Sequence, residues 1–271
     1  MSFAQKLREA AKKNQSLVCL GLDPDPSLMP AVSVLEFNRA IVDATADLVC
    51  AYKPNLAFYE ALGAEGIEIL QKTLEHIPAD IPVIGDAKRG DIGHTAQAYA
   101  RALFELVRFD AVTVNPYLGY DSVEPFLAYS DKGVFVLCRT SNPGATDFQD
   151  LLCSSDAQDN RHPLYTAVAR KASEWNRNGN IGLVMGATSP RELQEVRRIC
   201  PQMILLIPGV GAQGGDLDQA VRHGVDRQGG NALFSSSRQV LFASRESDFA
   251  QKARQAAEAL RLRIGNILSE L

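Results

Sequence analysis

The sequence has no surplus of basic residues and no long apolar run, and these two absences exclude several classes of protein. Its 28 lysine and arginine residues are balanced by 32 acidic ones, giving a net charge of −4, whereas wholesale nucleic-acid binding favours a strong basic surplus. No apolar run approaches the roughly 20 residues that a membrane-spanning helix needs. The first 15 residues are charged and precede no apolar signal core. We therefore expect a cytoplasmic protein that binds neither nucleic acid nor a membrane.

Cysteine is scarce, and it lacks the paired spacing of metal and redox sites. The chain contains five cysteines, an odd number spread widely along the sequence, and neither a Cys-x-x-Cys nor a His-x-x-x-His pair. Such a set is typical of reduced thiols that are mostly buried as small apolar side chains. We therefore expect no disulfide framework, no metal centre and no cysteine nucleophile.

What the sequence does have is a regular series of short apolar segments, which we interpret as strands. Several are continuously apolar, such as VFVLC and MILLI. Continuous apolarity predicts strands buried on both faces, as in a parallel sheet covered by helices. The predicted strands are residues 17–22, 50–54, 82–86, 111–115, 133–139, 181–186, 203–208 and 232–235.

Segments with helical periodicity separate these strands. The predicted helices are residues 34–49, 57–76, 95–107, 191–199, 216–223 and 247–264. A strand recurs about every 30 residues, and eight such units favour a closed barrel, which typically takes about 250 residues. We therefore predict an α/β fold in which residues 1–271 form a single (β/α)8 TIM barrel, with an extra helix in the first 15 residues. The polar segment 141–163 follows the fifth strand, where the loops of such barrels carry function.

Charged residues cluster where the third strand ends, in the sequence GDAKRGD. Asp86 and Lys88 are two residues apart, so on a strand both side chains face the same way, into the mouth of the barrel. Asp91 stands where the next helix is predicted to begin. Thr95 follows four residues later, so we expect these two residues to share one helix face.

Polar groups also follow other strands. The first strand runs into GLDPD, which contains Asp23, and the second runs into YKPN, which contains Lys53 and Asn55. The seventh runs into the glycine-rich IPGVGAQGGD, and the eighth into SSSR with Arg238. Loops after the seventh and eighth strands are the recurrent phosphate site of barrels, and a guanidinium suits a phosphate. The sequence predicts a pocket with a phosphate at one end and a carboxylate–lysine array at the other.

Together these motifs resemble orotidine 5′-phosphate decarboxylases, in particular the bacterial longer-chain group called type 2. The motifs are GLDPD, YKPN, GDAKRGDIGHTA, RTSNPGA, PGVGAQGGD and SSSR, in the order of that family between residues 22 and 238. The resemblance implies decarboxylation of orotidine 5′-monophosphate (OMP) to uridine 5′-monophosphate (UMP), the last step of de novo UMP synthesis, without a cofactor or metal. It also implies a homodimer.

The resemblance assigns catalytic roles to four charged residues. Lys88 would donate a proton to C6 of the pyrimidine, and Asp86 would lie beside the leaving carboxylate. Lys53 would join them in an array of alternating charge, which Asp91 of the other subunit would complete.

Further residues would hold the substrate. The ribose hydroxyls would contact Asp23, Lys53 and, across the dimer interface, Thr95. Ser141 would bind the edge of the pyrimidine. Gln213 and Arg238 would bind the phosphate, and Pro208 and Gly209 would frame it.

Two alternatives remain open at this point. A related barrel that acts on sugar phosphates would share DxKxxD, but it would use a divalent metal and lack a residue that reads a pyrimidine. A nucleotide-binding barrel without catalysis is the second alternative. The presence of both lysines and both aspartates of the charge array argues against it. A protein that only binds its ligand would gain nothing from burying the carboxylate of Asp86 next to the carboxylate of that ligand.

Overall fold

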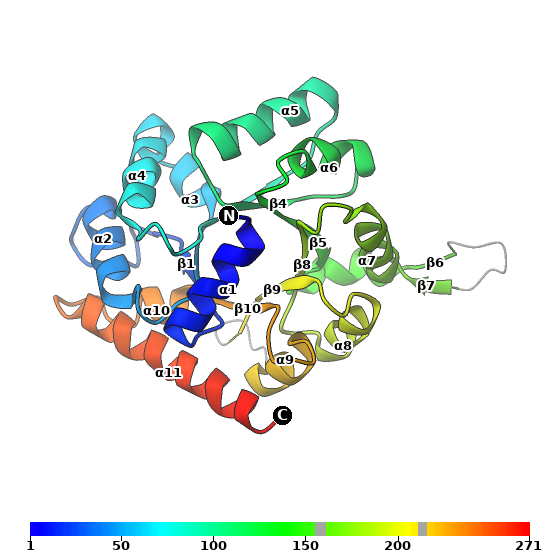
Figure 1. Cartoon of the computed structure of the whole chain (residues 1–271). Helices are drawn as coiled ribbons and strands as arrows, with labels where there is room; N and C mark the ends of the chain where they lie inside the picture. Colours follow the sequence, from blue (N-terminus) through cyan, green and yellow to red (C-terminus); the bar gives the residue numbers. More distant parts are fainter. Residues whose placement is uncertain (155–160, 211–215) are drawn as a thin grey trace.

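A ring of parallel strands forms the centre of the molecule in the computed structural model, which describes residues 1–154, 161–210 and 216–271 (Figure 1). The strand order is β2-β1-β10-β9-β8-β5-β4-β3, and bridges between Tyr52 and Val83 and between Asn55 and Asp86 join β2 to β3. The predicted (β/α)8 barrel is thereby confirmed. Its strands are β1 (Val18–Leu22), β2 (Ala51–Pro54), β3 (Ile84–Arg89), β4 (Ala111–Val114), β5 (Gly133–Arg139), β8 (Ile181–Met185), β9 (Ile204–Pro208) and β10 (Ala232–Ser236).

Helices surround the barrel and cover its outer face (Figure 1). Each presents an apolar stripe to the strands, and the strands themselves are almost wholly buried. The helices between and after the strands are α2 (Val34–Thr45), α3 (Leu56–Glu60), α4 (Gly63–His76), α5 (Gly93–Arg101), α6 (Tyr120–Leu127), α7 (Leu164–Trp175), α8 (Pro190–Ile199), α9 (Leu217–Gly224), α10 (Arg238–Leu241) and α11 (Phe249–Ser269).

Two predicted helices differ from those in the structure. The helix predicted at 57–76 is broken into α3 and α4, and Gly63 at the break has a φ of 68°, in the left-handed region that glycine tolerates. The helix predicted at 95–107 ends as α5 at Arg101 and continues as a π-helix over Ala102–Leu106. In both cases the segment keeps its place between two strands of the barrel.

The predicted helix start at Asp91 is wrong. The third strand continues to Arg89, and α5 begins only at Gly93. The carboxylate of Asp91 accepts a hydrogen bond from the N–H of Ile92, a local side chain–backbone contact that lies before the helix. Asp91 therefore lies outside the helix that contains Thr95, and the two do not share a helix face.

The predicted N-terminal helix is confirmed as α1 (Phe3–Asn14), and it covers the end of the barrel where the strands begin (Figure 1). A capping box between Ser2 and Gln5 starts it. Phe3 packs edge-on against Phe135 of β5, with ring centroids 5.7 Å apart, and a Cβ at Gly133 would lie only 2.4 Å from the Phe3 ring. This helix thus closes the end of the barrel opposite the predicted site.

The described residues of the polar segment after β5 include regular secondary structure. It contains a 3₁₀-helix over Pro143–Asp147 and an antiparallel hairpin of β6 (Leu152–Ser154) and β7 (Arg161–Pro163). The hairpin projects from the barrel beside α7 (Figure 1).

The cysteines are free, as predicted. Cys19, Cys50, Cys138 and Cys200 are buried, and Cys153 is half-buried. Burial raises the pKa of the Cys200 thiol to about 11, so this thiol stays protonated at neutral pH. In the part of the chain that the structure describes, we find no helix whose length and apolarity would let it span a membrane.

Candidate active site

Most of the predicted site residues meet in one pocket at the carboxyl ends of the strands. Its volume is about 510 Å³. Of the eleven predicted residues, eight line it: Asp23, Lys53, Asp86, Lys88, Ser141, Pro208, Gly209 and Arg238. Gln213 lies outside the described residues, and neither Asp91 nor Thr95 lines the pocket.

An alternating array of charges forms the centre of the pocket. The carboxylate of Asp86 lies between two ammonium groups, with Oδ2 3.0 Å from Nζ of Lys53 and Oδ1 2.6 Å from Nζ of Lys88. The side chains of Lys53 and Asp86 are only 7% and 11% exposed, whereas that of Lys88 is 48% exposed. Lys88 is therefore the member of the array that is free to meet a bound molecule.

The array keeps its charges because its members compensate one another. Burial alone would lower the pKa of Lys53, but the carboxylates of Asp86 and Asp23 outweigh it and raise that pKa above its usual value. Burial alone would raise the pKa of Asp86, but the two lysines hold it well below its usual range. Lys53 and Asp86 are therefore both ionised at neutral pH.

Thr113 of β4 holds this array in place, and the sequence analysis missed it. Its hydroxyl lies 3.0 Å from Oδ1 of Asp86 and accepts a hydrogen bond of 2.9 Å from the backbone N–H of Lys88. Lys88 has a φ of 47°, a conformation that costs a residue other than glycine about 1–3 kcal/mol. The contact with Thr113 stabilises this backbone, and the only sequence signal was a single polar residue in the apolar strand AVTV.

Asp23 connects three strand ends. Its Oδ1 accepts a hydrogen bond of 3.2 Å from the backbone N–H of Asn55, which follows β2. Its Oδ2 accepts one of 2.5 Å from the hydroxyl of Ser237, which follows β10. Sequence analysis named Asn55 as a polar strand end but did not identify Ser237.

The wall formed by the segment after β5 is anchored by a buried arginine. Arg139, with a side chain 8% exposed, binds both carboxylate oxygens of Asp150, at 2.9 and 3.1 Å. The side-chain amide of Gln149 accepts a hydrogen bond of 2.8 Å from the N–H of Thr140. These contacts fix Ser141 at the pocket, and Gln149, which also lines the pocket, was not predicted.

The opposite wall carries the residues predicted to bind phosphate. Gly209 has a φ of 95°, which glycine alone adopts without strain, and its backbone lines the pocket after Pro208. Arg238 is the first residue of α10 and is exposed. Among the described residues, no side chain forms an ion pair with its guanidinium, so the group is free to bind an anion.

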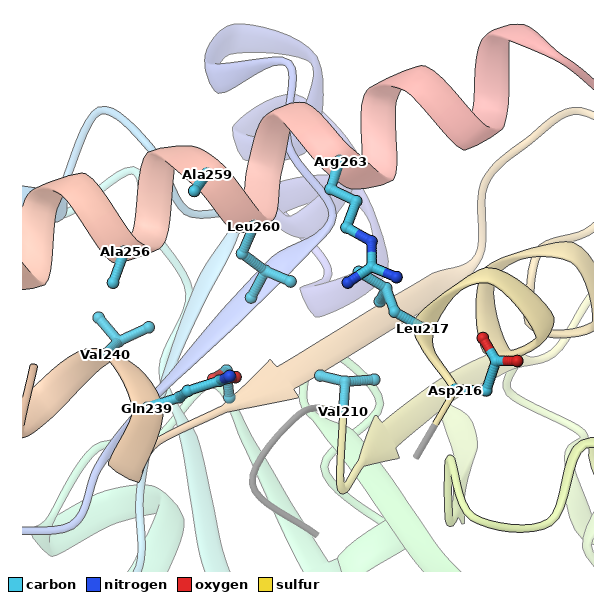
Figure 2. A pocket seen from close by; sticks show the side chains of 10 residues that line it. Val210, Asp216, Leu217, Gln239, Val240, Ala256, Ala259, Leu260 and Arg263 are labelled. Atoms are coloured by element: carbon cyan, nitrogen blue, oxygen red, sulfur yellow. The ribbon is translucent and has the colours of Figure 1, made fainter. Parts of the chain in front are cut away.

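A second cavity of about 530 Å³ lies behind this wall, among α9, α10 and α11 (Figure 2). Val210 and Ser236 line both cavities. The second cavity contains none of the predicted residues, and apolar side chains such as Val240 and Leu260 dominate it. Its charged residues are Asp216, which precedes α9, and Arg263 of α11, and they do not form a cluster of alternating charge like that of the first pocket. The chemistry therefore favours the first pocket as the active site.

Within residues 1–154, 161–210 and 216–271, the histidine, cysteine and acidic side chains form no group of three or more that could hold a metal ion.

Comparisons with known proteins show which sequences and structures this chain is similar to. Residues 16–255 match the model of the family described as "Orotidine 5′-phosphate decarboxylase / HUMPS family". A protein of Dehalococcoides mccartyi named orotidine 5′-phosphate decarboxylase is 55% identical over 262 residues, 96% of each chain. One of the same name from Thermomicrobium roseum is 51% identical, over 100% of this chain and 98% of its own. The solved structure of Leishmania donovani OMP decarboxylase is similar with a TM-score of 0.88 and 41% identity, covering 99% of this chain and 100% of its own.

Proposed function

The chain belongs to the orotidine 5′-phosphate decarboxylase family, and on this basis we propose that it converts OMP to UMP and carbon dioxide without a cofactor. The observation that carries the proposal is the Lys53–Asp86–Lys88 array at the mouth of the barrel. It places a buried carboxylate between two ammonium groups, one of which is accessible from the pocket.

Lys88 is the residue that this proposal assigns to proton transfer. When the bond between C6 and the carboxylate breaks, its electron pair stays on C6, where the ring delocalises it poorly. The ammonium of Lys88 stabilises this developing charge and then transfers its proton to C6, which completes UMP. Solvent returns a proton to the Lys88 amine. Asp86, which is itself paired with Lys53, holds the ammonium of Lys88 in place.

Repulsion by Asp86 contributes less than carbanion stabilisation. Two unit charges about 4 Å apart interact by about 4 kcal/mol at an effective dielectric of about 20. Enzymatic rate enhancements typically require about 8–23 kcal/mol. Repulsion between Asp86 and the substrate carboxylate therefore supplies a minor part of the lowering of the activation free energy. The fixed positive charge beside C6 must supply a larger part.

The pocket walls suggest how OMP is oriented. The free guanidinium of Arg238 and the backbone at Pro208–Gly209 suit the phosphate, and Asp23 suits the ribose hydroxyls. Ser141, on the wall anchored by Arg139, suits the pyrimidine edge. Gln213 remains part of the proposed phosphate site, although it lies outside the described residues.

The proposal includes a homodimer in which Asp91 and Thr95 complete the pocket of the other subunit. Asp91 is half-buried and Thr95 is exposed, and neither lines the pocket of its own chain. The rim beside them carries exposed apolar side chains: Ile92 is 53%, Leu118 49% and Tyr117 83% exposed. The loops that bear them are adjacent, because the N–H of Asn115 donates to the carbonyl of Arg89. Such a surface favours burial against a second copy.

Mixing two inactive variants tests this shared site. Asp91→Ala and Lys88→Ala proteins are each expected to be inactive, and a mixture that exchanges subunits should recover about a quarter of wild-type activity. In a mixed dimer, one site contains both substitutions and the other contains neither. Steady-state assays of the mixture, with exchange confirmed by tagged subunits, provide the measurement. No recovery after confirmed exchange would show that each site is self-contained.

Decarboxylation itself is tested by following the pyrimidine absorbance of OMP with purified, metal-stripped protein. Conversion to UMP should proceed at the same rate with and without EDTA, because the proposed chemistry uses only protein charges. Loss of activity in EDTA, with recovery on adding a divalent cation, would contradict the proposal. It would favour a barrel that acts on sugar phosphates. Tight binding of OMP without turnover would indicate a binding protein.

A further inference from the structure

Ser237 lies where the proposed ribose and phosphate ends of the pocket meet. It follows Ser236, the last residue of β10, and precedes Arg238, the first residue of α10. Serine at this position commonly caps a helix through its hydroxyl, but the Ser237 side chain makes no capping hydrogen bond. Its hydroxyl instead donates to Oδ2 of Asp23, at 2.5 Å.

Gly21 of β1 provides a second, independent observation. A Cβ at this residue would lie 1.9 Å from Oγ of Ser237 and 3.0 Å from Oδ2 of Asp23. The first strand therefore leaves room for this hydroxyl, and the glycine of GLDPD is required by a residue far along the chain.

The contacts of Asp23 fix its orientation. The hydroxyl of Ser237 occupies one carboxylate oxygen, and the N–H of Asn55 occupies the other. Each oxygen of a carboxylate can accept more than one hydrogen bond, so both keep acceptor capacity toward the pocket. Because both oxygens of Asp23 are held by hydrogen bonds, the carboxylate cannot rotate freely, and its remaining lone pairs keep one direction relative to the pocket.

We propose that Ser237 is a positioning residue that aims Asp23 at a ribose hydroxyl and thereby sets the preference for ribose over deoxyribose nucleotides. This inference rests on the proposed function, because it concerns the sugar of OMP. Ser237 acts through Asp23, whereas the neighbouring Arg238 acts on the phosphate directly.

The test compares kcat/KM for OMP and for its 2′-deoxy and 3′-deoxy analogues in wild-type and Ser237→Ala protein. The Ser237→Ala variant should lose about ten-fold in kcat/KM for OMP, mainly through KM, because the hydrogen bond it removes is made to a charged group. For the analogue that lacks the hydroxyl bound by Asp23, the loss should stay below about two-fold. In an Asp23→Ala background, Ser237→Ala should cause no further loss. Equal losses for OMP and both analogues would overturn the proposal and leave Ser237 a structural role.

Two further variants separate positioning from folding. Ser244→Ala removes a similar serine–aspartate hydrogen bond, of 2.6 Å to Asp248, outside the pocket, and should leave the preference unchanged. Gly21→Ala should lower Tm through its clash with Ser237. Adding Ser237→Gly should restore Tm without restoring the ribose preference. Recovery of that preference in the double variant would contradict the proposed role of the hydroxyl.

Calorimetric binding of UMP and 2′-deoxyuridine 5′-monophosphate distinguishes failure of the proposed enzymatic function from failure of the role proposed for Ser237. Wild-type protein that binds neither nucleotide and does not decarboxylate OMP would overturn both proposals. Normal decarboxylation with an unchanged ribose preference in Ser237→Ala would overturn only the role of Ser237.

Discussion

Replacing Lys88 by alanine is expected to lower the turnover of OMP by about 10⁴-fold or more while the barrel stays folded. The variant removes a general acid, which contributes about 10²–10⁴-fold. It also removes a fixed positive charge at the developing carbanion, a contribution of about 10²–10³-fold for comparable groups. The Lys88 side chain is 48% exposed, so its loss opens no core cavity, and Asp86 keeps Lys53 as a partner. Absorbance assays of kcat, together with circular dichroism through thermal unfolding, measure both outcomes.

A matched control for this variant is Lys171→Ala. Lys171 also forms a lysine–carboxylate pair, with Glu174 at 2.7 Å, and its side chain is 58% exposed, but it lies on α7 outside the pocket. The Lys171→Ala variant should turn over OMP at the wild-type rate. If the Lys88→Ala variant turned over OMP near the wild-type rate, that result would contradict the proposed mechanism.

Replacing Arg238 by alanine should lower kcat/KM for OMP by about 10- to 150-fold. A charge-assisted contact with the phosphate contributes about 1.5–3 kcal/mol, and 1.4 kcal/mol corresponds to about ten-fold. The nucleoside orotidine has no phosphate, so its slow reaction should hardly change. Added phosphite dianion should accelerate the wild-type reaction of orotidine, because it can occupy the phosphate site unattached, and it should do much less for the variant.

Arg263→Ala is the control that distinguishes the two cavities. Arg263 is an exposed arginine of the second cavity (Figure 2). Its removal should affect neither OMP turnover nor the response to phosphite. If Arg238→Ala lowered kcat/KM equally for OMP and for orotidine, Arg238 would act on folding or on the pyrimidine ring instead of on the phosphate. The phosphate contacts would then have to lie in the backbone after Pro208.

The barrel could be predicted because its signal is local. Segments such as VFVLC and MILLI are apolar without interruption, and each became a buried strand. Charges at the carboxyl ends of parallel strands must lie at one end of the barrel, so Asp23, Lys53, Asp86 and Lys88 could be assigned to one pocket from the sequence.

Other features depend on contacts between distant residues. Thr113 is 27 residues from Asp86, and Ser237 is 214 residues from Asp23, so no spacing rule pairs them. The predicted helix start at Asp91 was wrong for a local reason. An aspartate side chain can bind a nearby backbone N–H outside a helix as well as at a helix N-terminus, so its position alone does not fix where the helix begins. Whether Asp91 and Thr95 act across an interface stays a prediction.

The helix that closes the barrel has a consequence for the order in which the chain folds. Phe3 and Leu7 of α1 are buried in one cluster with residues from every barrel strand, from Cys19 of β1 to Leu233 of β10. Translation produces α1 before any strand of the barrel, yet the surface that buries α1 is complete only when β10 has joined the ring. Docking of α1 therefore belongs to the final stage of assembly. A helix that is synthesised before the whole barrel is thus among the last elements to be buried.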